Sequence, residues 1–323
     1  ANELVIDTTG GVAPTVDALI ANSLTPTITG TATLGDGESL SVTVSGATYT
    51  VTPADGVWSV DLATATPTSG ALAPLVDGDT YSITATVTDS ANNEVNDATS
   101  GELVIDTTAP TILAVTSATP DGSYGAGQAI TITIQMSEAV TVDTTLGNPT
   151  LTLNTTPARS ATFTSAVGNL LTFTYTSQAG DNATDLDATA LNLNGAVIED
   201  AAGNTADFTT IATKLSGAAA IVIDTTAPVA PTITSQTTAT VPPTITGTSG
   251  TGAALNAGEV LSVSVNGATY EVTPDGTGAW SLDLAAAVPV SGTLGAFADG
   301  TFSVTATITD EVGNAASDTT ANE

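Results

Sequence analysis

The residues with the clearest chemical potential are aspartates that recur in two short motifs. The first motif is Asp-Thr-Thr, which follows Val-Ile at Asp7, Asp106 and Asp224. The second is Asp-x-x-x-Asn, which spans 89–93 and recurs at 200–204 and 310–314. In each loop the residue before the asparagine is Asn or Gly, which can adopt positive φ, so the turn is tight and two side-chain oxygens face one side. A single loop of this kind is typical of an ordinary turn, and it is the expected topology, described below, that favours a site.

Oxygen ligands are the only ones that this chain offers to a metal. It contains no His and no Cys, which excludes the usual zinc ligand sets, disulfides, thiol chemistry and a Ser-His-Asp triad. Carboxylate, amide and backbone carbonyl oxygens suit Ca²⁺, which takes six to eight of them at about 2.3–2.6 Å in forgiving geometry. Mg²⁺ demands a stricter octahedron and is the weaker choice. We therefore expect Ca²⁺ as the cofactor.

The charge balance supports a role for cations. Asp and Glu number 33, the basic residues are Arg159 and Lys214 alone, and the formal net charge is −31. Such a chain repels itself. Divalent cations are the simplest source of positive charge, although a basic protein could also supply it. Nucleic acid is a poor partner because phosphate binding needs Lys and Arg. For carboxylates outside the named loops, the charge could equally serve only to keep the protein soluble.

The elements that position these loops are β-strands. Thr, Val, Ala and Gly dominate and helix signals are absent, so the composition predicts an all-β protein. The Asp-Thr-Thr motifs are 99 and 118 residues apart, which is typical of β-sandwich modules. We expect three tandem Ig-like sandwiches in a linear array. The predicted divisions are a terminal strand at 1–7, module one at 8–106, variant module two at 107–224 and module three at 225–323.

Alternating apolar and polar residues, separated by Gly-, Pro- and Asp-containing turns, predict the strands. In module one they cover 26–32, 40–44, 48–51, 58–62, 81–88 and 102–105. In module two they cover 129–136, 150–154, 161–164, 170–176 and 219–223, with an acidic connection at 181–187. Module three repeats module one at 261–270, 280–284 and 302–310. Trp58 and Trp280 occupy matching positions and are predicted to be core residues.

The expected topology gathers the acidic loops at the joints between modules. In an up-and-down walk through seven antiparallel strands, the loop before the last strand lies where the first strand enters. The loop after the second strand reaches the same pole, and the loop before the sixth strand of the preceding module points toward it. The predicted ligands are Asp7, Asp36, Glu38, Asp77, Asp79, Asp89, Asn93, Asp106, Glu138, Asp200, Asn204, Asp224, Glu259, Asp310 and Asn314.

A cation at such a joint would turn repelling carboxylates into cross-links between neighbouring modules. The joint would then be stiff. Strands of about 6–8 residues, rising about 3.3 Å each, give modules of roughly 35–45 Å, so three in line would span somewhat over 100 Å. The predicted function is to hold something at a distance.

Three features of the chain resemble the bacterial Ig-like repeats of giant biofilm and RTX-type adhesins. They are the joints at 106–110 and 224–228, the loops at 200–204 and 310–314, and Ser137-Glu138-Ala139-Val140. The resemblance covers essentially the whole chain. It implies extracellular extender modules that are secreted unfolded by a type I system, become rigid in calcium and project a ligand-binding domain from the bacterial cell surface. In module one Asn92 stands where the family has glycine, and Gly10-Gly11 stands where the other two joints have Ala109-Pro110 and Ala227-Pro228. The nonapeptide calcium repeats and anchor of whole adhesins are not found in this chain.

Residues 1–7 read as a final strand without its own domain, which an excerpt of a tandem polypeptide would explain. A filament or matrix subunit that donates its first strand to a neighbour would show the same pattern. Another alternative is a glycan- or protein-binding adhesion module, with Arg159, Lys214 and the 181–187 loop of module two recognising the ligand. An enzyme is not expected, since aromatic residues make up only 4%. No stretch reaches the roughly 20 apolar residues of a membrane helix, and no signal segment is visible.

Overall fold

The computed structural model describes residues 6–318, apart from the side chains of residues 209–213. Within this range the protein is all-β, and the only helix is the 3-10 turn η1 (Leu215–Gly217). The strand expected over residues 1–7 lies mostly outside the described residues, as do residues 319–323. No helix among the described residues is long and apolar enough to cross a membrane.

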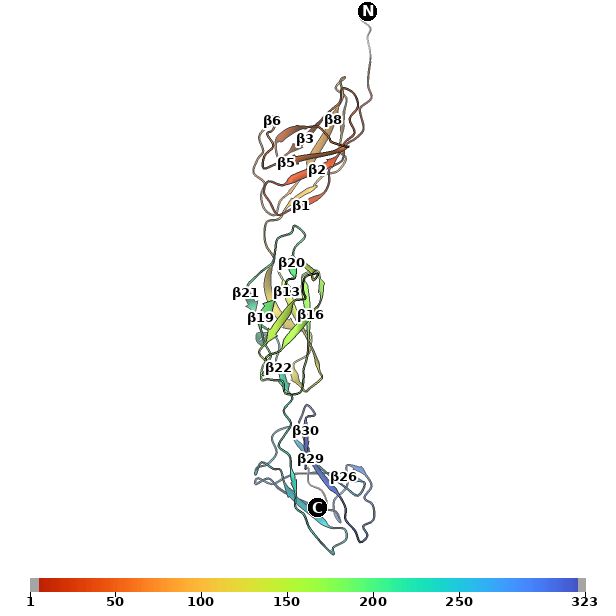
Figure 1. Ribbon diagram of the computed structural model, residues 1–323, viewed down its shortest axis with the longest axis vertical. Helices are drawn as coiled ribbons and strands as arrows, with labels where there is room; N and C mark the ends of the chain where they lie inside the picture. The colour runs from red at the N-terminus through yellow and green to blue at the C-terminus, as the bar shows by residue number, and fades with distance from the viewer. Residues whose placement is uncertain (1–5, 319–323) are drawn as a thin grey trace, which may run out of the picture.

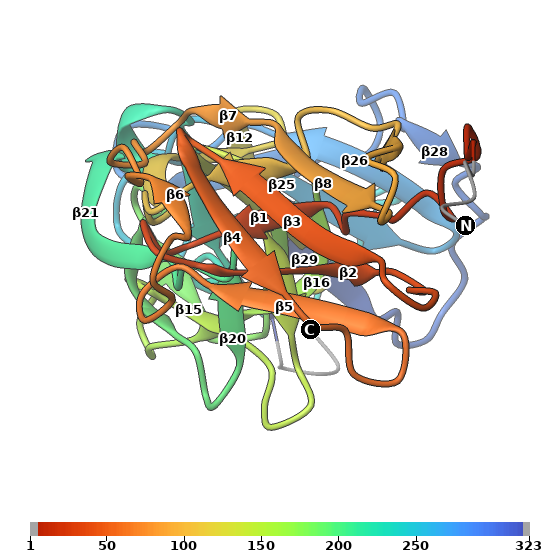
Figure 2. The same cartoon turned by 90° about the horizontal axis from the view of Figure 1, so that it is seen from above.

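Three separate hydrophobic cores organise the described residues. One core lies between Val16 and Ile105, the second between Ile112 and Ile223, and the third between Ile245 and Ile308. We keep the names module one, two and three for residues 8–106, 107–224 and 225–323. Figure 1 shows the three groups of strands in succession along the longest axis. They overlap in projection when they are viewed from above (Figure 2).

Module one forms a sandwich of three sheets, ordered β6-β4-β3-β8-β9, β1-β10-β7 and β2-β5. Its core residues come from all three sheets, including Val42, Leu103 and Ile28. Its strands are β1 (Leu19–Ala21), β2 (Thr27–Thr31), β3 (Ser39–Val44), β4 (Ala47–Val51), β5 (Val57–Asp61), β6 (Ser69–Gly70), β7 (Thr80–Tyr81), β8 (Ile83–Thr88), β9 (Glu94–Asn96) and β10 (Leu103–Ile105).

Module two is built around a seven-stranded sheet of order β19-β15-β16-β17-β13-β11-β21. Smaller sheets, β12-β22-β18 and β14-β20, complete it. Its strands are β11 (Thr111–Ser117), β12 (Gly122–Tyr124), β13 (Ala129–Met136), β14 (Thr141–Asp143), β15 (Thr150–Leu153), β16 (Ser160–Val167), β17 (Leu170–Thr176), β18 (Asn182–Ala183), β19 (Ala188–Asn192), β20 (Val197–Glu199), β21 (Asp207–Thr213) and β22 (Ile221–Asp224).

Module three repeats the five-stranded sheet of module one as β28-β26-β25-β29-β30, and it extends the counterpart of β2-β5 by one strand to β23-β24-β27. The described residues contain no counterpart of the β1-β10-β7 sheet. Its strands are β23 (Thr232–Ile233), β24 (Thr244–Thr248), β25 (Val260–Val265), β26 (Ala268–Val272), β27 (Ala279–Asp283), β28 (Ser291–Gly292), β29 (Val304–Thr309) and β30 (Ala315–Ser317).

Alternation explains why these segments form strands. In β13, Ile130, Ile132 and Ile134 are fully buried, while the threonines between them are half-buried. Period-two alternation places the isoleucines on one face, and each buried isoleucine contributes roughly 1.5–3 kcal/mol. The predicted bounds of β13 and β17 match the structure.

Both tryptophans are core residues, as predicted. Trp58 is 1% exposed and Trp280 is 3% exposed. Each packs over a glycine on the neighbouring strand, and a Cβ on Gly30 would lie 2.5 Å from the Trp58 ring and 2.0 Å from the Thr15 carbonyl oxygen. Only glycine therefore fits at this crossing.

The wholly antiparallel walk expected from the sequence is wrong. β1 pairs with β10 in parallel, as do β11 with β21 and β12 with β22. In module one the first strand therefore lies beside the last strand in the same direction, and in module two the first two strands lie in the same direction beside the last two. The sequence prediction also missed β11 and β21, and it counted about seven strands where module one has β1 to β10. The strands of module one that were not predicted, β1, β6 and β9, have only two or three residues and are too short to produce a periodic pattern.

Candidate metal centre

The three Asp-x-x-x-Asn loops have the same internal geometry. In module two, Asp200 Oδ1 accepts hydrogen bonds from the backbone N–H groups of Ala202 at 2.8 Å and Asn204 at 2.9 Å. Asn204 Nδ2 donates to Asp200 Oδ2 at 2.8 Å. Equivalent bonds link Asp89 to Asn93 and Asp310 to Asn314. The residue before each asparagine has positive φ, as predicted: Asn92 at 64°, Gly203 at 85° and Gly313 at 90°.

Each loop is bonded to the joint that precedes its own module. Asn204 Nδ2 donates to the Asp106 carbonyl oxygen at 2.8 Å, and Asn314 Nδ2 donates to that of Asp224 at 3.0 Å. Asn93 Nδ2 lies 3.4 Å from the Asp7 carbonyl oxygen. The loops and joints predicted to meet therefore do lie together. The asparagines use the amide nitrogen as donors here, whereas the sequence prediction gave them an oxygen ligand.

Three carboxylates converge at the joint between modules one and two. Asp106 follows β10, Glu138 follows β13 and Asp200 follows β20. Each presents a carboxylate oxygen, and these oxygens all lie within 4.8 Å of one another. Asp200 is buried and the other two are half-buried. Among the described residues this is the only such group of acidic side chains.

The electrostatics of this group are unfavourable without a cation. Partial burial raises the pKa of Glu138, and the neighbouring charges of Asp106, Asp200 and Asp77 raise it further. Arg159 forms an ion pair with Asp181 in the described structure, so it does not neutralise the carboxylates at this joint. That ion pair lies at the other end of module two, where the Asp181 backbone contacts Thr225.

The donor set fits a hard divalent cation. Three carboxylates close enough to share one ion, partly withdrawn from water, are a typical Ca²⁺ arrangement. Asp106, Glu138 and Asp200 would hold the ion, and Asn204, which donates to Asp200 and to the Asp106 carbonyl oxygen, would keep the loop at the joint. The ion would neutralise the charge that now raises the Glu138 pKa.

Asp77 reaches the same joint from the loop before β7 and closes it by hydrogen bonding. Its Oδ1 accepts from Thr107 N–H at 2.5 Å, and its Oδ2 accepts from Thr108 Oγ1 at 2.7 Å. These bonds hold the Asp77 pKa below its ordinary value. Asp79 bonds within module one instead, where its backbone oxygen accepts from Ile105 N–H at 3.0 Å.

Asn22 adds a contact across this joint that sequence reasoning missed. Its Nδ2 donates to the Gly203 carbonyl oxygen at 3.3 Å. Asn22 directly follows β1, and because β1 runs parallel to β10, it ends at the same pole as Asp106. Recognising the parallel pair would have identified it.

At the joint between modules two and three, an amide side chain replaces the carboxylate of Asp77. Asn182 takes the role of Asp77, with Oδ1 accepting from Thr225 N–H at 3.2 Å and Thr226 Oγ1 at 2.9 Å. Glu259 turns back onto its own loop, where it accepts from Asn256 N–H at 2.9 Å. Asp224, Glu259 and Asp310 therefore do not form a group of three like that at Asp106. The sequence prediction did not name Asn182, although it lies in the 181–187 connection.

The first joint also lacks a three-carboxylate group within the described residues. Glu38 accepts from Gly35 N–H at 2.7 Å and lies against Gly11, where a Cβ would be 2.4 Å from Glu38 Oε1. Ala-Pro at residues 10 and 11 would require the side chains of Val95 and Glu38 to shift. Asp7 bonds to Thr9, and Asp36 is exposed on the loop tip.

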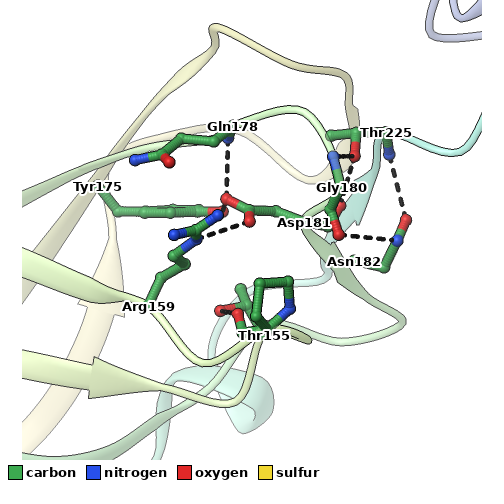
Figure 3. A network of polar contacts seen from close by, with 9 residues as sticks. Thr155, Arg159, Tyr175, Gln178, Gly180, Asp181, Asn182 and Thr225 are labelled. Carbon is green, nitrogen blue, oxygen red and sulfur yellow. Dashed lines mark hydrogen bonds and ion pairs between the residues drawn. The ribbon is translucent and has the colours of Figure 1, made fainter.

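A buried polar network lies next to the joint between modules two and three (Figure 3). Asp181 is fully buried, and its carboxylate accepts from Arg159 Nε at 2.7 Å, Tyr175 Oη at 2.7 Å and Gln178 N–H at 2.8 Å. Its backbone oxygen accepts from Thr225 Oγ1 at 2.9 Å. Burial and the bond to Asp181 raise the Tyr175 pKa above its ordinary value. Arg159, suggested above as a ligand-binding residue, bonds to Asp181 through Nε and keeps 31% of its side chain exposed.

No protein-family model and no curated protein matches this chain. Among solved structures, it is similar to the Bacteroides ovatus mixed-linkage glucan utilization locus protein SGBP-B, in complex with a mixed-linkage heptasaccharide. The identity is 18% and the TM-score 0.19, over 97% of this chain and 64% of that one. A Streptomyces avermitilis alpha-L-rhamnosidase complexed with L-rhamnose gives 12% identity and a TM-score of 0.19, over 95% of this chain and 40% of that one. Likenesses this weak carry no argument about function.

Proposed function

We propose that this chain is a calcium-stiffened structural stalk, or extender, of a bacterial surface adhesin that acts in cell adhesion and biofilm formation. In this proposal the modules are three Ig-like sandwiches in a linear array, located outside the cell. Neighbouring repeats of the same polypeptide are its partners. The chain has no catalytic role.

The group of Asp106, Glu138 and Asp200 is the observation that supports this function best. Its members come from the joint strand and from two loops of the next module, so one ion bound to all three would fix module two against module one. Asn204 already bonds to the Asp106 carbonyl oxygen, so the loop is preorganised at the joint. A site placed between modules acts on their relative orientation, which is the property that a stalk needs.

Small-angle scattering and thermal unfolding of the full chain test this function. With calcium, we expect a longer maximum dimension and a higher melting temperature than in chelator, because the ion replaces repulsion with cross-links. Asp106→Ala should abolish the calcium response while the modules stay folded, since Asp106 lies outside the cores. Asp185→Ala, at an exposed position away from this joint, is the control. Length and melting temperature that are unchanged by chelator would refute the proposal.

A further inference from the structure

The turn between β25 and β26 carries an asparagine followed by a glycine. Val265 pairs with Ala268, so Asn266 and Gly267 form a two-residue hairpin loop. Both have positive φ, 45° for Asn266 and 88° for Gly267, as a type I′ turn requires. Asn266 is half-buried and Gly267 is exposed. The turn therefore places an Asn-Gly peptide bond at the surface of module three.

An asparagine that precedes glycine is prone to lose its side-chain amide. The backbone nitrogen of the glycine attacks the asparagine Cγ, and this approach is least hindered where the next residue has no Cβ. The hairpin bonds run between Val265 and Ala268, and in the described part of the chain the Gly267 N–H has no hydrogen-bond partner. No acceptor therefore holds the attacking nitrogen in place.

The Asn266 amide also holds a neighbouring segment. Its Nδ2 donates to the carbonyl oxygens of Gly295 at 2.8 Å and Ala296 at 3.3 Å. In return, Gly295 N–H donates to the Asn266 carbonyl oxygen at 2.9 Å. An ionised carboxylate has no proton to donate. An aspartate at this position would therefore lose both side-chain bonds and place a negative charge against two carbonyl oxygens.

Module one contains the same turn without an asparagine. Ser45 and Gly46 connect β3 to β4, with φ of 44° and 85°. The Ser45 carbonyl oxygen accepts from Ala73 N–H at 2.9 Å, and Ser45 Oγ donates to the Ala73 carbonyl oxygen at 3.2 Å. Serine thus holds its neighbouring segment in the same way, but its side chain has no carbonyl carbon for a nitrogen to attack.

We propose that Asn266 is a site of spontaneous deamidation, which releases the segment 293–296 from the β25–β26 turn. The Gly267 nitrogen forms a bond to Asn266 Cγ, the bond from Cγ to Nδ2 breaks, and ammonia leaves with the proton that the attacking nitrogen gives up. Water then opens the cyclic imide at either carbonyl, which gives aspartate or isoaspartate. Asparagine is among the thermolabile residues, and the reaction requires no enzyme, oxidant or metal.

Peptide mapping of the full chain by mass spectrometry, after incubation in chelator at mildly alkaline pH, tests this site separately from the proposed calcium function. We expect aspartate and isoaspartate to form at residue 266 severalfold faster than at Asn204, which precedes the β-branched Thr205. Labelling by an isoaspartate-specific methyltransferase identifies the isoaspartate fraction. Equal rates at the two asparagines of the folded chain would overturn the proposal.

Module one supplies the matched variants. Asn266→Ser should abolish the product at this turn and leave thermal unfolding close to that of the wild type, because Ser45 holds the equivalent turn. Ser45→Asn should create a new reactive site in module one, since Gly46 already follows it. A Ser45→Asn chain that forms no product at residue 45 would show that this turn does not permit the reaction, and would overturn the proposal.

Asn266→Asp reproduces one product directly and tests the release of the segment. It should melt at a lower temperature than Asn266→Ser. Amide hydrogen exchange should be severalfold faster at Thr293 and Gly295, whose N–H groups donate to the carbonyl oxygens of Gly267 and Asn266 in the intact turn. Exchange that is unchanged in Asn266→Asp would contradict the release of this segment.

Discussion

At the residue scale, Asp181 shows how an acidic side chain can serve structure rather than binding. It is fully buried, and its carboxylate is the common acceptor for Arg159, Tyr175 and Gln178. Its backbone oxygen accepts from Thr225, so the same residue links the core of module two to the joint behind it. A buried charge of this kind is tolerated only when its partners are all present.

Replacing Asp181 by Asn should therefore destabilise module two. The change leaves the Arg159 charge without its partner and turns one acceptor into a donor, at a cost of roughly 3 kcal/mol. Urea unfolding of the full chain measures this cost. Asp185→Asn is the matched control, because Asp185 is exposed in the same connection. Equal unfolding midpoints for the two variants would contradict the structural role of Asp181.

The contribution of Asp181 to stability should also depend on pH. Burial alone would raise the pKa of Asp181, but bonds from Arg159, Tyr175 and Gln178 more than offset it and lower the pKa. A lowered folded pKa gives stability that is present above the unfolded value of about 3.9 and is lost as pH falls through the folded value. The stability gap between wild type and Asp181→Asn should thus narrow below about pH 4. A constant gap would argue against this linkage.

Sequence reasoning succeeded where residue patterns are long and failed where contacts are non-local. The alternation in β13 predicted its bounds, and the repeated loops predicted that Asp200 and Asn204 would lie near Asp106. The acidic connection at 181–187 gave no sign that Asp181 is buried, because its partner Arg159 comes from another part of the chain. The parallel pairing of β1 with β10 is equally invisible to a local pattern.

At the element scale, the two joints that follow β10 and β22 share a backbone design but differ in charge. Asp77 and Asn182 accept equivalent bonds from the Asp-Thr-Thr turn, one with a carboxylate and the other with an amide. At the Asp106 joint, Glu138 is a third member of the group of carboxylates. At the Asp224 joint, Glu259 instead accepts a hydrogen bond from Asn256 N–H. We therefore expect a cation to act mainly at the Asp106 joint.

Glu138→Gln tests this difference. It removes one charged ligand, so we expect calcium affinity to fall by about tenfold or more, since affinity follows ligand charge. In chelator at neutral pH the variant should melt at the same temperature as wild type or higher, because a repelling carboxylate has gone. Calorimetric titration and thermal unfolding of the full chain measure both effects. Glu259→Gln is the matched control, and equal losses of affinity in the two variants would place the site elsewhere.

At the scale of the whole molecule, the net charge of −31 raises a competing explanation for any response to salt. General repulsion among exposed carboxylates is screened by monovalent ions, with a Debye length of about 8 Å at 0.15 M. A bound cation acts differently, because it joins specific oxygens and changes one joint rather than the entire chain. Resolving the response joint by joint therefore separates the two explanations.

Fluorescence energy transfer between engineered cysteines makes this separation, and the chain has no native cysteine to interfere. One labelled pair would span modules one and two, and another would span modules two and three. At a fixed ionic strength of about 0.15 M, millimolar calcium barely alters the Debye length. We expect it to narrow the distance distribution of the first pair and to affect the second far less, because only the Asp106 joint gathers three carboxylates in the described structure. Sodium chloride matched in ionic strength should change the distance distribution of neither labelled pair. Equal responses at both joints, or a response to sodium chloride, would indicate that the acidic charge serves only to keep the protein soluble.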